Sequence, residues 1–200
     1  MSTLGRLPRI DRDQVLKEAM ALADEQGLDT LSMSAVAGRL GVTAMALYRH
    51  VGSKAELLDG LVEVLLTDFP PPPADLAWPQ RLSFLATEIC ASARRHPGVF
   101  PLLLRRSAAT KLARRTREAV YAALREAGVA EDRVAQTERL LSTAILGFAA
   151  SEAAGRFRGY SRRQLDADFE QLQDMLGDFV RSCANRYGDP LAATNRVNPE

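Results

Sequence analysis

The sequence predicts an all-α protein in two helical parts, and three observations lead to this conclusion. The chain of 200 residues is rich in Ala, Leu, Arg and Glu and has only 6% aromatic residues, a composition that favours helices. Apolar residues recur at spacings of three and four, and no segment alternates as a half-buried strand would. The run Pro70–Pro73 cannot continue a helix, so we place the boundary between the two parts there.

The first expected helix spans Asp11–Gln26. Asp11 is a suitable N-cap because its carboxylate can accept hydrogen bonds from free amides of the first turn, and Gly27 follows as a stop signal. Leu28 and Leu31 are expected to close a small core over the next segment. The apolar face of this helix consists of Val15, Ala19, Leu22 and Ala23.

Two short helices around a tight turn are expected next. Ser34–Leu40 has apolar residues at helical spacing, and Gly41 stands where a chain leaving a helix commonly needs a positive φ. Thr43 follows and can cap a second helix, Ala44–His50. Proteins build probes for the DNA major groove from such a pair.

The second helix of this pair is expected to present a polar face. Leu47 and Val51 are four residues apart and can face inward. Tyr, His and Lys side chains can donate to phosphate oxygens, Arg can bond a guanine edge with two hydrogen bonds, and Met or Ala can pack on a thymine methyl. The alternative is an ordinary helical hairpin with Tyr48 half-buried and Arg49 solvated. The side chains expected to point outward or sideways are Ala44, Met45, Tyr48, Arg49 and His50.

The residues after this helix predict the start of a connector. Ser53 and Glu56 fit a capping box in which Ser53 caps the next helix and Glu56 bonds back to the Ser53 amide. Lys54 lies beside the same helix N-terminus, where a phosphate is favoured by free amides and by charge. The helix that follows is apolar on more than one side, so we expect residues 53–69 to connect the two parts.

The segment from about Arg9 to Leu66 resembles the N-terminal DNA-binding domain of the TetR family of bacterial transcriptional regulators. The resemblance implies that Thr43, Tyr48, His50 and Lys54 contact the phosphate backbone. It also implies that Ala44, Met45 and Arg49 face base edges. It covers about a third of the chain and rests on residues at fixed spacing, namely Leu31, Ser32, Ala37, Leu40, Gly41, Val42, Leu47, Tyr48, His50, Val51, Lys54, Leu57 and Leu58.

Two further positions are candidate DNA contacts. Ser34 stands where some family members carry a longer polar side chain, often Arg, that reads a base. Arg9 belongs to an arm over residues 1–10 that can reach along DNA, although a frayed terminus is the alternative. With the arm, the helix-turn-helix DNA-binding domain is expected to occupy residues 1–52.

The charge of this first part opposes a DNA-binding role. The formal net charge of the chain is only +1, and residues 1–66 hold seven Lys and Arg against nine Asp and Glu. A local patch matters more than the sum. The basic residues expected to contribute to such a patch are Arg6, Arg9, Arg39, Arg49 and Lys54.

The second part is expected to be a helical ligand-binding and dimerisation domain over residues 74–200. Helical patterns cover residues 77–95, 98–105, 108–127, 131–157 and 162–186. His96 is expected to cap the break before Gly98 rather than bind a ligand. We interpret the basic residues between Arg105 and Arg117 as a solvated face, with a phosphate-contacting role as the alternative.

The last two helices predict a homodimer. Apolar residues of the last helix form a seam typical of helix pairs, and small residues of the helix before it allow close approach, although packing within one subunit would look the same. A two-fold dimer would read a palindromic double-stranded operator as two half-sites ~34–36 Å apart. The predicted interface residues are Leu140, Ala144, Gly147, Ser151, Leu165, Phe169, Leu172, Leu176 and Phe179.

A small-molecule cavity is expected between the boundary and the dimer helices. Aromatic walls with a few polar groups are typical of such pockets, but core packing would use the same residues. The resemblance to ligand-released repressors implies an effector of unknown identity. The predicted lining residues are Phe84, Glu88, Phe100, Leu104, Tyr121, Phe148 and Glu152.

Other classes of protein are poorly supported by the sequence. His50 and His96 are the two histidines and lie far apart, no catalytic or metal-binding motif occurs, and neither a cofactor nor a metal is expected. No apolar run is long enough for a membrane span or a secretion signal, so a cytoplasmic protein is expected. Cys90 and Cys183 should remain packed thiols. The alternatives are a helical protein-interaction module and a DNA-binding regulator that responds to no ligand.

Overall fold

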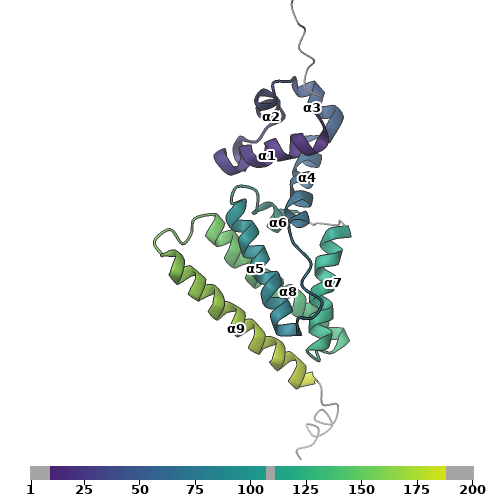
Figure 1. The fold of residues 1–200 in the computed structure, drawn as a ribbon, viewed down its shortest axis with the longest axis vertical. Coiled ribbons are helices and arrows are strands. Elements are labelled where there is room, and N and C mark those ends of the chain that lie inside the picture. The colour runs from purple at the N-terminus through teal and green to yellow at the C-terminus, as the bar shows by residue number, and fades with distance from the viewer. Residues whose placement is uncertain (1–9, 107–110, 188–200) are drawn as a thin grey trace, which may run out of the picture. The chain divides into compact units, whose positions relative to one another are not determined.

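The computed structural model describes residues 10–106 and 111–187, and within these ranges every regular element is a helix (Figure 1). The chain forms two compact units. The first unit combines the chain up to Leu65 with His96–Ala108, and the second combines Leu66–Arg95 with the chain from Ala109 onward. The sequence predicted one boundary at Pro70–Pro73, and the return of the chain to the first unit after Arg95 was not foreseen.

The first unit begins with α1 (Arg12–Gln26), which starts and ends as predicted. The Asp11 carboxylate accepts the Gln14 N–H at 2.8 Å, and the Gln14 side chain accepts the Asp11 N–H at 3.2 Å, so both halves of a capping box are present. Gly27 ends the helix at φ 85°, and a short 3₁₀ turn, Leu28–Thr30, follows.

Three more helices build the core of the first unit. These are α2 (Met33–Leu40), α3 (Ala44–Val51) and α4 (Lys54–Thr67), and the last residues of α4 belong to the second unit. Their apolar faces meet α1, as the sequence pattern predicts. The fully buried core residues are Val15, Ala19, Leu31, Val36, Leu47, Leu57 and Leu61.

The segment after α5 is attached to the first unit at two points. The Asp24 carboxylate of α1 contacts His96 Nδ1 at 2.8 Å and accepts the Gly98 N–H at 3.0 Å. Arg106 donates to the Ala55 carbonyl oxygen of α4 at 3.1 Å and pairs with Asp59. The segment therefore links the end of α1 to the first half of α4.

This segment differs from the helix predicted over residues 98–105. Only α6 (Leu102–Arg105) is helical, because Pro97 and Pro101 interrupt the turns before it. The His96 carbonyl oxygen accepts the Val99 and Phe100 N–H groups and so forms the turn that follows α5. The His96 ring binds Asp24 and fixes the segment to α1.

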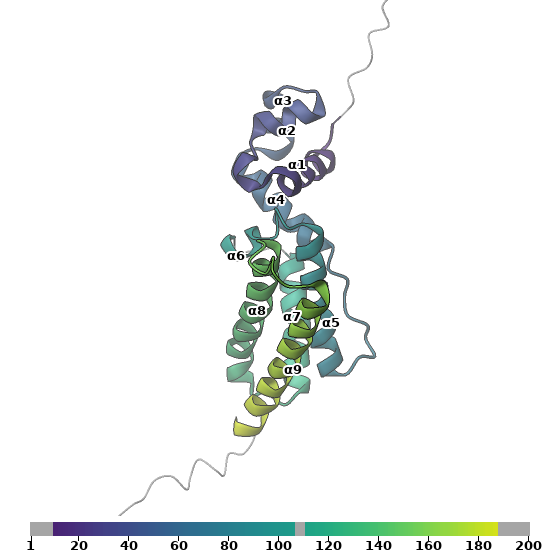
Figure 2. The same cartoon turned by 90° about the vertical axis from the view of Figure 1, so that its left-hand side faces the viewer.

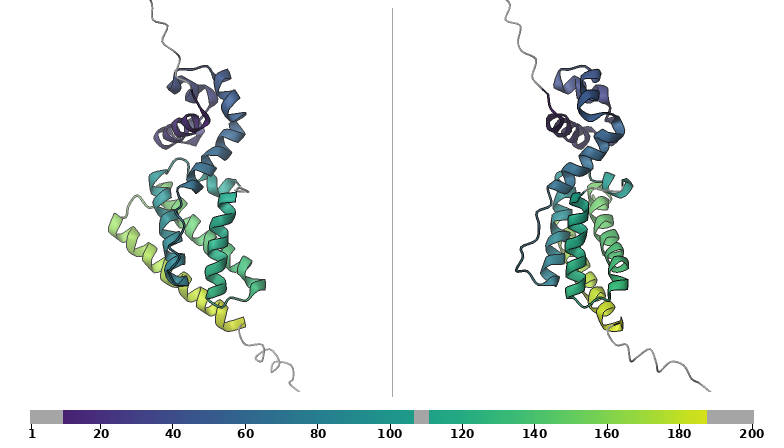
Figure 3. Two further views of the ribbon diagram at one scale, coloured as in Figure 1. Left: turned by 45° about the vertical axis from the view of Figure 1, so that its right-hand side comes forward. Right: turned by 90° about the vertical axis from the view of Figure 1, so that its right-hand side faces the viewer.

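The second unit is a bundle of α5 (Trp78–Arg95), α7 (Lys111–Glu126), α8 (Glu131–Ala153) and α9 (Arg162–Tyr187). α7 and α5 both pack on α8, and α9 runs obliquely past α5 and α8 (Figures 2 and 3). Helix α8 ends four residues before the predicted residue 157, because Gly155 at φ 71° turns the chain. One core cluster of this unit contains Leu124, Val129, Val134, Leu141 and Val180.

None of the helices within the described residues has the length and apolarity that a membrane span requires.

Candidate nucleic-acid interface and cavity

The turn between α2 and α3 has the geometry that its glycine predicts. Gly41 lies in the left-handed region at φ 67°. Its N–H donates to the Gly38 carbonyl oxygen at 3.2 Å, and the Val42 N–H donates to the Ala37 carbonyl oxygen at 3.0 Å, which together form a Schellman motif. The turn therefore satisfies the last carbonyl groups of α2 and sets the direction of α3.

Helix α3 begins at the predicted cap and buries the predicted side. The Thr43 Oγ1 accepts the Ala46 N–H at 3.3 Å, and Leu47 and Val51 are buried. Met45 is 72% exposed and Tyr48 is 45% exposed, so both side chains reach the solvent-facing side of α3.

The other candidate DNA contacts also reach the surface. Ser34, Thr43, Arg49 and Lys54 are exposed, and Ala44 and His50 are half-buried. Arg9 lies outside the described residues. Within the described part of the chain, Arg49 and Lys54 form no ion pair, so both cations are available to an outside partner. These residues give the first unit one solvent-facing surface, made of α3 and its two neighbouring turns.

Arg39 does not contribute to the basic patch in the way the sequence suggested. Its guanidinium binds the Glu25 carboxylate at 2.6 Å and also pairs with Glu18. The hydrogen bond to Glu25 raises the pKa of Arg39, and the same bond lowers the pKa of Glu25. The charge of Arg39 is therefore neutralised by carboxylates of α1, and Arg39 is not a free cation.

The N-terminus of α4 is capped by Ser53, as predicted, but Glu56 acts differently. The Ser53 Oγ accepts the Glu56 N–H at 3.2 Å and donates to Glu56 Oε1 at 3.0 Å. The Ser53 N–H donates to the Val51 carbonyl oxygen at 2.8 Å, so the predicted return bond from Glu56 to that amide was wrong. The local turn after α3, with Gly52 at φ 67°, already satisfies this amide.

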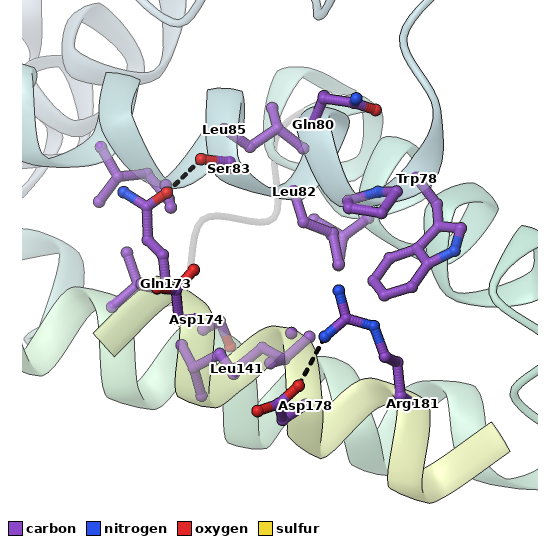
Figure 4. Close-up of a pocket in the computed structure, with 18 residues that line it drawn as sticks. Trp78, Gln80, Leu82, Ser83, Leu85, Leu141, Gln173, Asp174, Asp178 and Arg181 are labelled. Atoms are coloured by element: carbon purple, nitrogen blue, oxygen red, sulfur yellow. Dashed lines mark hydrogen bonds and ion pairs between the residues drawn. The ribbon is translucent and has the colours of Figure 1, made fainter. Parts of the chain in front are cut away.

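The second unit contains a cavity of about 600 Å³ between α5, α7, α8 and α9 (Figure 4). Most of its wall is apolar. The apolar lining residues are Trp78, Pro79, Leu82, Leu85, Ala86, Ile89, Val120, Leu141, Ile145, Leu176 and Gly177. A cavity of this size and composition is typical of small-molecule sites.

The polar side of the cavity belongs mostly to α9. Ser83 of α5 donates to Gln173, and Arg181 binds Asp178 at 2.6 Å while its guanidinium lies 5.7 Å from the centre of the Trp78 ring (Figure 4). Asp174 also lines the cavity. The remaining polar lining residues are Gln80 and Ser142.

None of the seven residues predicted to line a ligand cavity lines this one. Phe84 and Glu88 lie on α5 between the lining positions, and Phe100 is fully buried in the first unit, where Leu104 also lies. Tyr121 packs beside the core cluster around Leu124. The spacing of apolar residues located the helices correctly, but it could not show which apolar face of a helix lines the cavity.

Phe148 and Glu152 instead belong to a packed cluster at the other end of α8. The Phe148 ring lies 5.5 Å from the Phe157 ring and 5.4 Å from the Phe169 ring. Glu152 is 7% exposed, binds Arg94 at 3.0 Å and also pairs with Arg162. Burial in the same region raises the pKa of Cys90 to about 12. This cluster joins α5, α8 and α9 through ring contacts and ion pairs.

The residues that do line the cavity were largely missed by sequence reasoning. Trp78, the only tryptophan of the chain, and Asp178 and Arg181 of α9 were not among the residues predicted to line a cavity. Their significance depends on the crossing of α9 over α5, which the sequence does not contain. Among the described residues no three metal-ligand side chains come together.

The residues predicted to form a dimer seam divide into two groups. Leu165 and Phe169 are buried within the single chain, and Leu176 and Phe179 are half-buried and pack against its core, so a role of these four residues in a dimer stays a prediction. Their periodicity reflects packing of α9 on its own bundle.

The second group remains accessible. Leu140 of α8 is 52% exposed, Ala144, Ser151 and Leu172 are half-buried, and a Cβ added at Gly147 would meet nothing within 4 Å. Met175 of α9, which sequence reasoning overlooked, is 60% exposed. An apolar surface with small residues on α8 is therefore open to solvent.

Two protein-family models match the chain. One, described as bacterial regulatory proteins of the tetR family, matches residues 15–61, and the other, the tetracyclin repressor-like C-terminal domain, matches residues 83–176. Among curated proteins, the transcriptional repressor DrrR1 of Streptomyces coeruleorubidus is 29% identical over 171 residues, which cover 84% of this chain and 63% of that protein.

Solved structures share the whole fold. Apo ActR from Streptomyces coelicolor superposes with a TM-score of 0.77 at 20% identity, covering 90% of this chain and 99% of that one. BioQ bound to its double-stranded DNA operator superposes with a TM-score of 0.70 at 26% identity, covering 84% and 98%. ActR has also been solved in complex with actinorhodin.

Proposed function

The chain belongs to the TetR family of bacterial regulatory proteins, and on this basis we propose that it is a homodimeric repressor that a small-molecule effector releases from a palindromic operator. The observation that carries the DNA-binding part is the surface of α3. Helix α3 is exposed, starts directly after a tight turn, and carries an exposed Met and an Arg that forms no ion pair with the other described residues, so it is suited to enter the major groove.

The residues of this surface divide into two roles. Thr43, Tyr48, His50 and Lys54 would donate to phosphate oxygens and fix the register on the duplex. Ala44, Met45 and Arg49 would face base edges, Arg49 with two hydrogen bonds to a guanine and Met45 against a thymine methyl. Ser34 and Arg9 would add contacts at the margin of this surface.

The dimer would form through α8. The exposed Leu140 and the open face at Gly147 allow a second copy to approach closely, and Ala144 and Ser151 are small enough to continue this contact. Leu172 and Met175 of α9 would add apolar area. Because each subunit brings one α3, a two-fold dimer reads two half-sites.

The effector would bind in the cavity of the second unit. Helix α5 supplies Trp78, Leu82 and Ser83 to its wall and ends at Arg95. The next residue, His96, is already bound to α1 of the first unit. An effector that favours one position of α5 would therefore also favour one position of the DNA-binding helices, and binding to two states with different affinity lowers operator affinity.

One experiment tests both parts of the proposal. Duplexes bound by the full chain are selected from a random pool, and the selection is repeated with candidate metabolites present. We expect a palindromic site whose binding falls steeply with salt, and at least one compound that weakens it. Binding without base preference would contradict the proposed reading by α3. A compound that binds the protein tightly without changing operator affinity would contradict release by an effector.

A further inference from the structure

The charged groups of the cavity are arranged unevenly. Three charged side chains line it, all from α9, and they are two carboxylates, Asp174 and Asp178, and one guanidinium, Arg181. No Lys or His is among the lining residues. The nearby Arg81 adds no free cation because it binds Glu126 at 3.0 Å. The wall therefore carries a net formal charge of −1.

The guanidinium of this set is already occupied. Arg181 binds Asp178 at 2.6 Å and lies over the Trp78 ring. An anionic ligand could reach Arg181 only by displacing Asp178, and two carboxylates one helical turn apart would then face it without a partner. Like charges at this spacing repel one another, so the arrangement disfavours anions.

Asp174, unlike Arg181, is available to a ligand. It lies one turn before Asp178 on α9, lines the cavity, and has neither a hydrogen bond nor an ion pair within the described part of the chain. On the α5 and α8 side of the cavity lie apolar side chains, among them Leu85 and Leu141 (Figure 4). A ligand with an apolar body on that side would bring any protonated nitrogen at its end close to this carboxylate.

We propose that the cavity takes hydrophobic amines, with a ring-containing apolar body against the wall of α5 and α8 and the ammonium group at Asp174. This inference rests on the proposed role of the cavity as the effector site. Neutral ligands of the same shape bind more weakly, and anions bind most weakly.

The test compares three probes of nearly equal shape, 4-biphenylmethylamine, 4-biphenylmethanol and 4-biphenylacetate, on the full chain. Because Trp78 is the only tryptophan and lines the cavity, its fluorescence reports binding there, and equilibrium dialysis gives the affinities. We expect the amine to bind roughly fivefold more tightly than the alcohol, with the acetate weakest.

Asp174→Asn should remove the preference for the amine and leave the affinity of the alcohol unchanged. Asp174 is exposed and has no partner in the described part of the chain, so this variant is expected to fold normally. The matched control is Glu170→Gln, which removes one exposed carboxylate from the same helix one turn earlier, outside the lining, and should keep the preference.

Every result other than these contradicts a defined part of the proposal. Equal binding of the three probes, tightest binding of the acetate, or a preference that survives Asp174→Asn overturns the assignment of hydrophobic amines, while the cavity remains an effector site. Failure of all three probes to bind overturns the cavity as an effector site as well, and leaves operator recognition by α3 untouched.

Discussion

Arg39 and Arg49 show how residues of the same type take different roles in the first unit. Arg39 is held by Glu18 and Glu25 and stabilises the contact between α2 and α1. Among the described residues Arg49 has no such partner, and it lies on the exposed side of α3. A count of seven basic against nine acidic residues therefore overstates the acidic excess, because Glu18 and Glu25 share the single partner Arg39 within the unit.

Replacing Arg49 by Ala should relax base preference at one position of each half-site. The loss of a two-bond contact to guanine costs ~1–3 kcal/mol of discrimination, which selection from a random duplex pool would detect. Arg39→Ala is the matched control, and its selected site should equal that of the wild type. An unchanged preference in Arg49→Ala would remove Arg49 from the set of base-reading residues.

At the scale of elements, the position of the segment between α5 and α6 depends on one close contact, which Gly98 makes with the backbone of α1. Gly98 donates to Asp24, and a Cβ at this position would overlap the Ala23 carbonyl oxygen of α1. The segment can lie on the end of α1 only because residue 98 has no side chain. This contact, together with the Arg106 pair, makes α6 part of the first unit.

Gly98→Ala should therefore destabilise the protein by ~1–3 kcal/mol, the usual cost of overpacking a fixed backbone contact. Gly38→Ala is the control, because Gly38 is a helical glycine of α2 with no atom within 4 Å of an added Cβ, and it should stabilise the protein by ~0.5–1 kcal/mol. Urea unfolding of both variants measures the two shifts. Equal stability of Gly98→Ala and wild type would show that the segment can move away from α1.

The exposed face of α8 allows a second test at this scale. Gly147→Leu should leave the fold of the single chain intact, because the position is open, but it should prevent close approach of a second copy. We expect a monomer by analytical ultracentrifugation and at least a tenfold weaker operator complex. Ala122→Leu, on an exposed position of α7, should remain dimeric. A dimeric Gly147→Leu would move the proposed interface elsewhere.

At the scale of the whole molecule, the chain passes between its two units three times. It crosses within α4, again between Arg95 and His96, and again between Ala108 and Ala109. Each crossing is covalent, so a rearrangement of the cavity helices has direct routes to the DNA-binding helices. This connectivity suits a protein in which a small molecule changes the distance between two α3 helices.

The dimer model makes a geometric prediction about the operator. Inserting half a helical turn, about five base pairs, between the two half-sites places them on opposite faces of the duplex. We expect affinity to fall to that of a single half-site in a mobility-shift assay. Insertion outside the half-sites is the control and should change nothing. Full affinity after the central insertion would contradict a rigid two-fold dimer.

The sequence by itself determined most of the helices, and with them the exposed helix α3 and the turn before it. Gly41, Thr43 and Asp11 act through neighbours within a few residues, so their roles as turn and caps could be predicted and are confirmed. The inward placement of Leu47 and Val51 follows from spacing alone. Local rules suffice here because each of these interactions closes within a single turn of chain.

Only the tertiary structure decided which helix faces meet. The pairing of Arg39 with α1, the return of His96 to Asp24, the burial of Phe169 and the cavity between Trp78 and Arg181 all join residues distant in sequence. An apolar stripe has the same spacing whether it packs within one chain, against a second copy or around a ligand. The physical reason is that periodicity fixes the direction in which a side chain points from its helix, whereas the crossing of the helices determines which neighbour that side chain contacts.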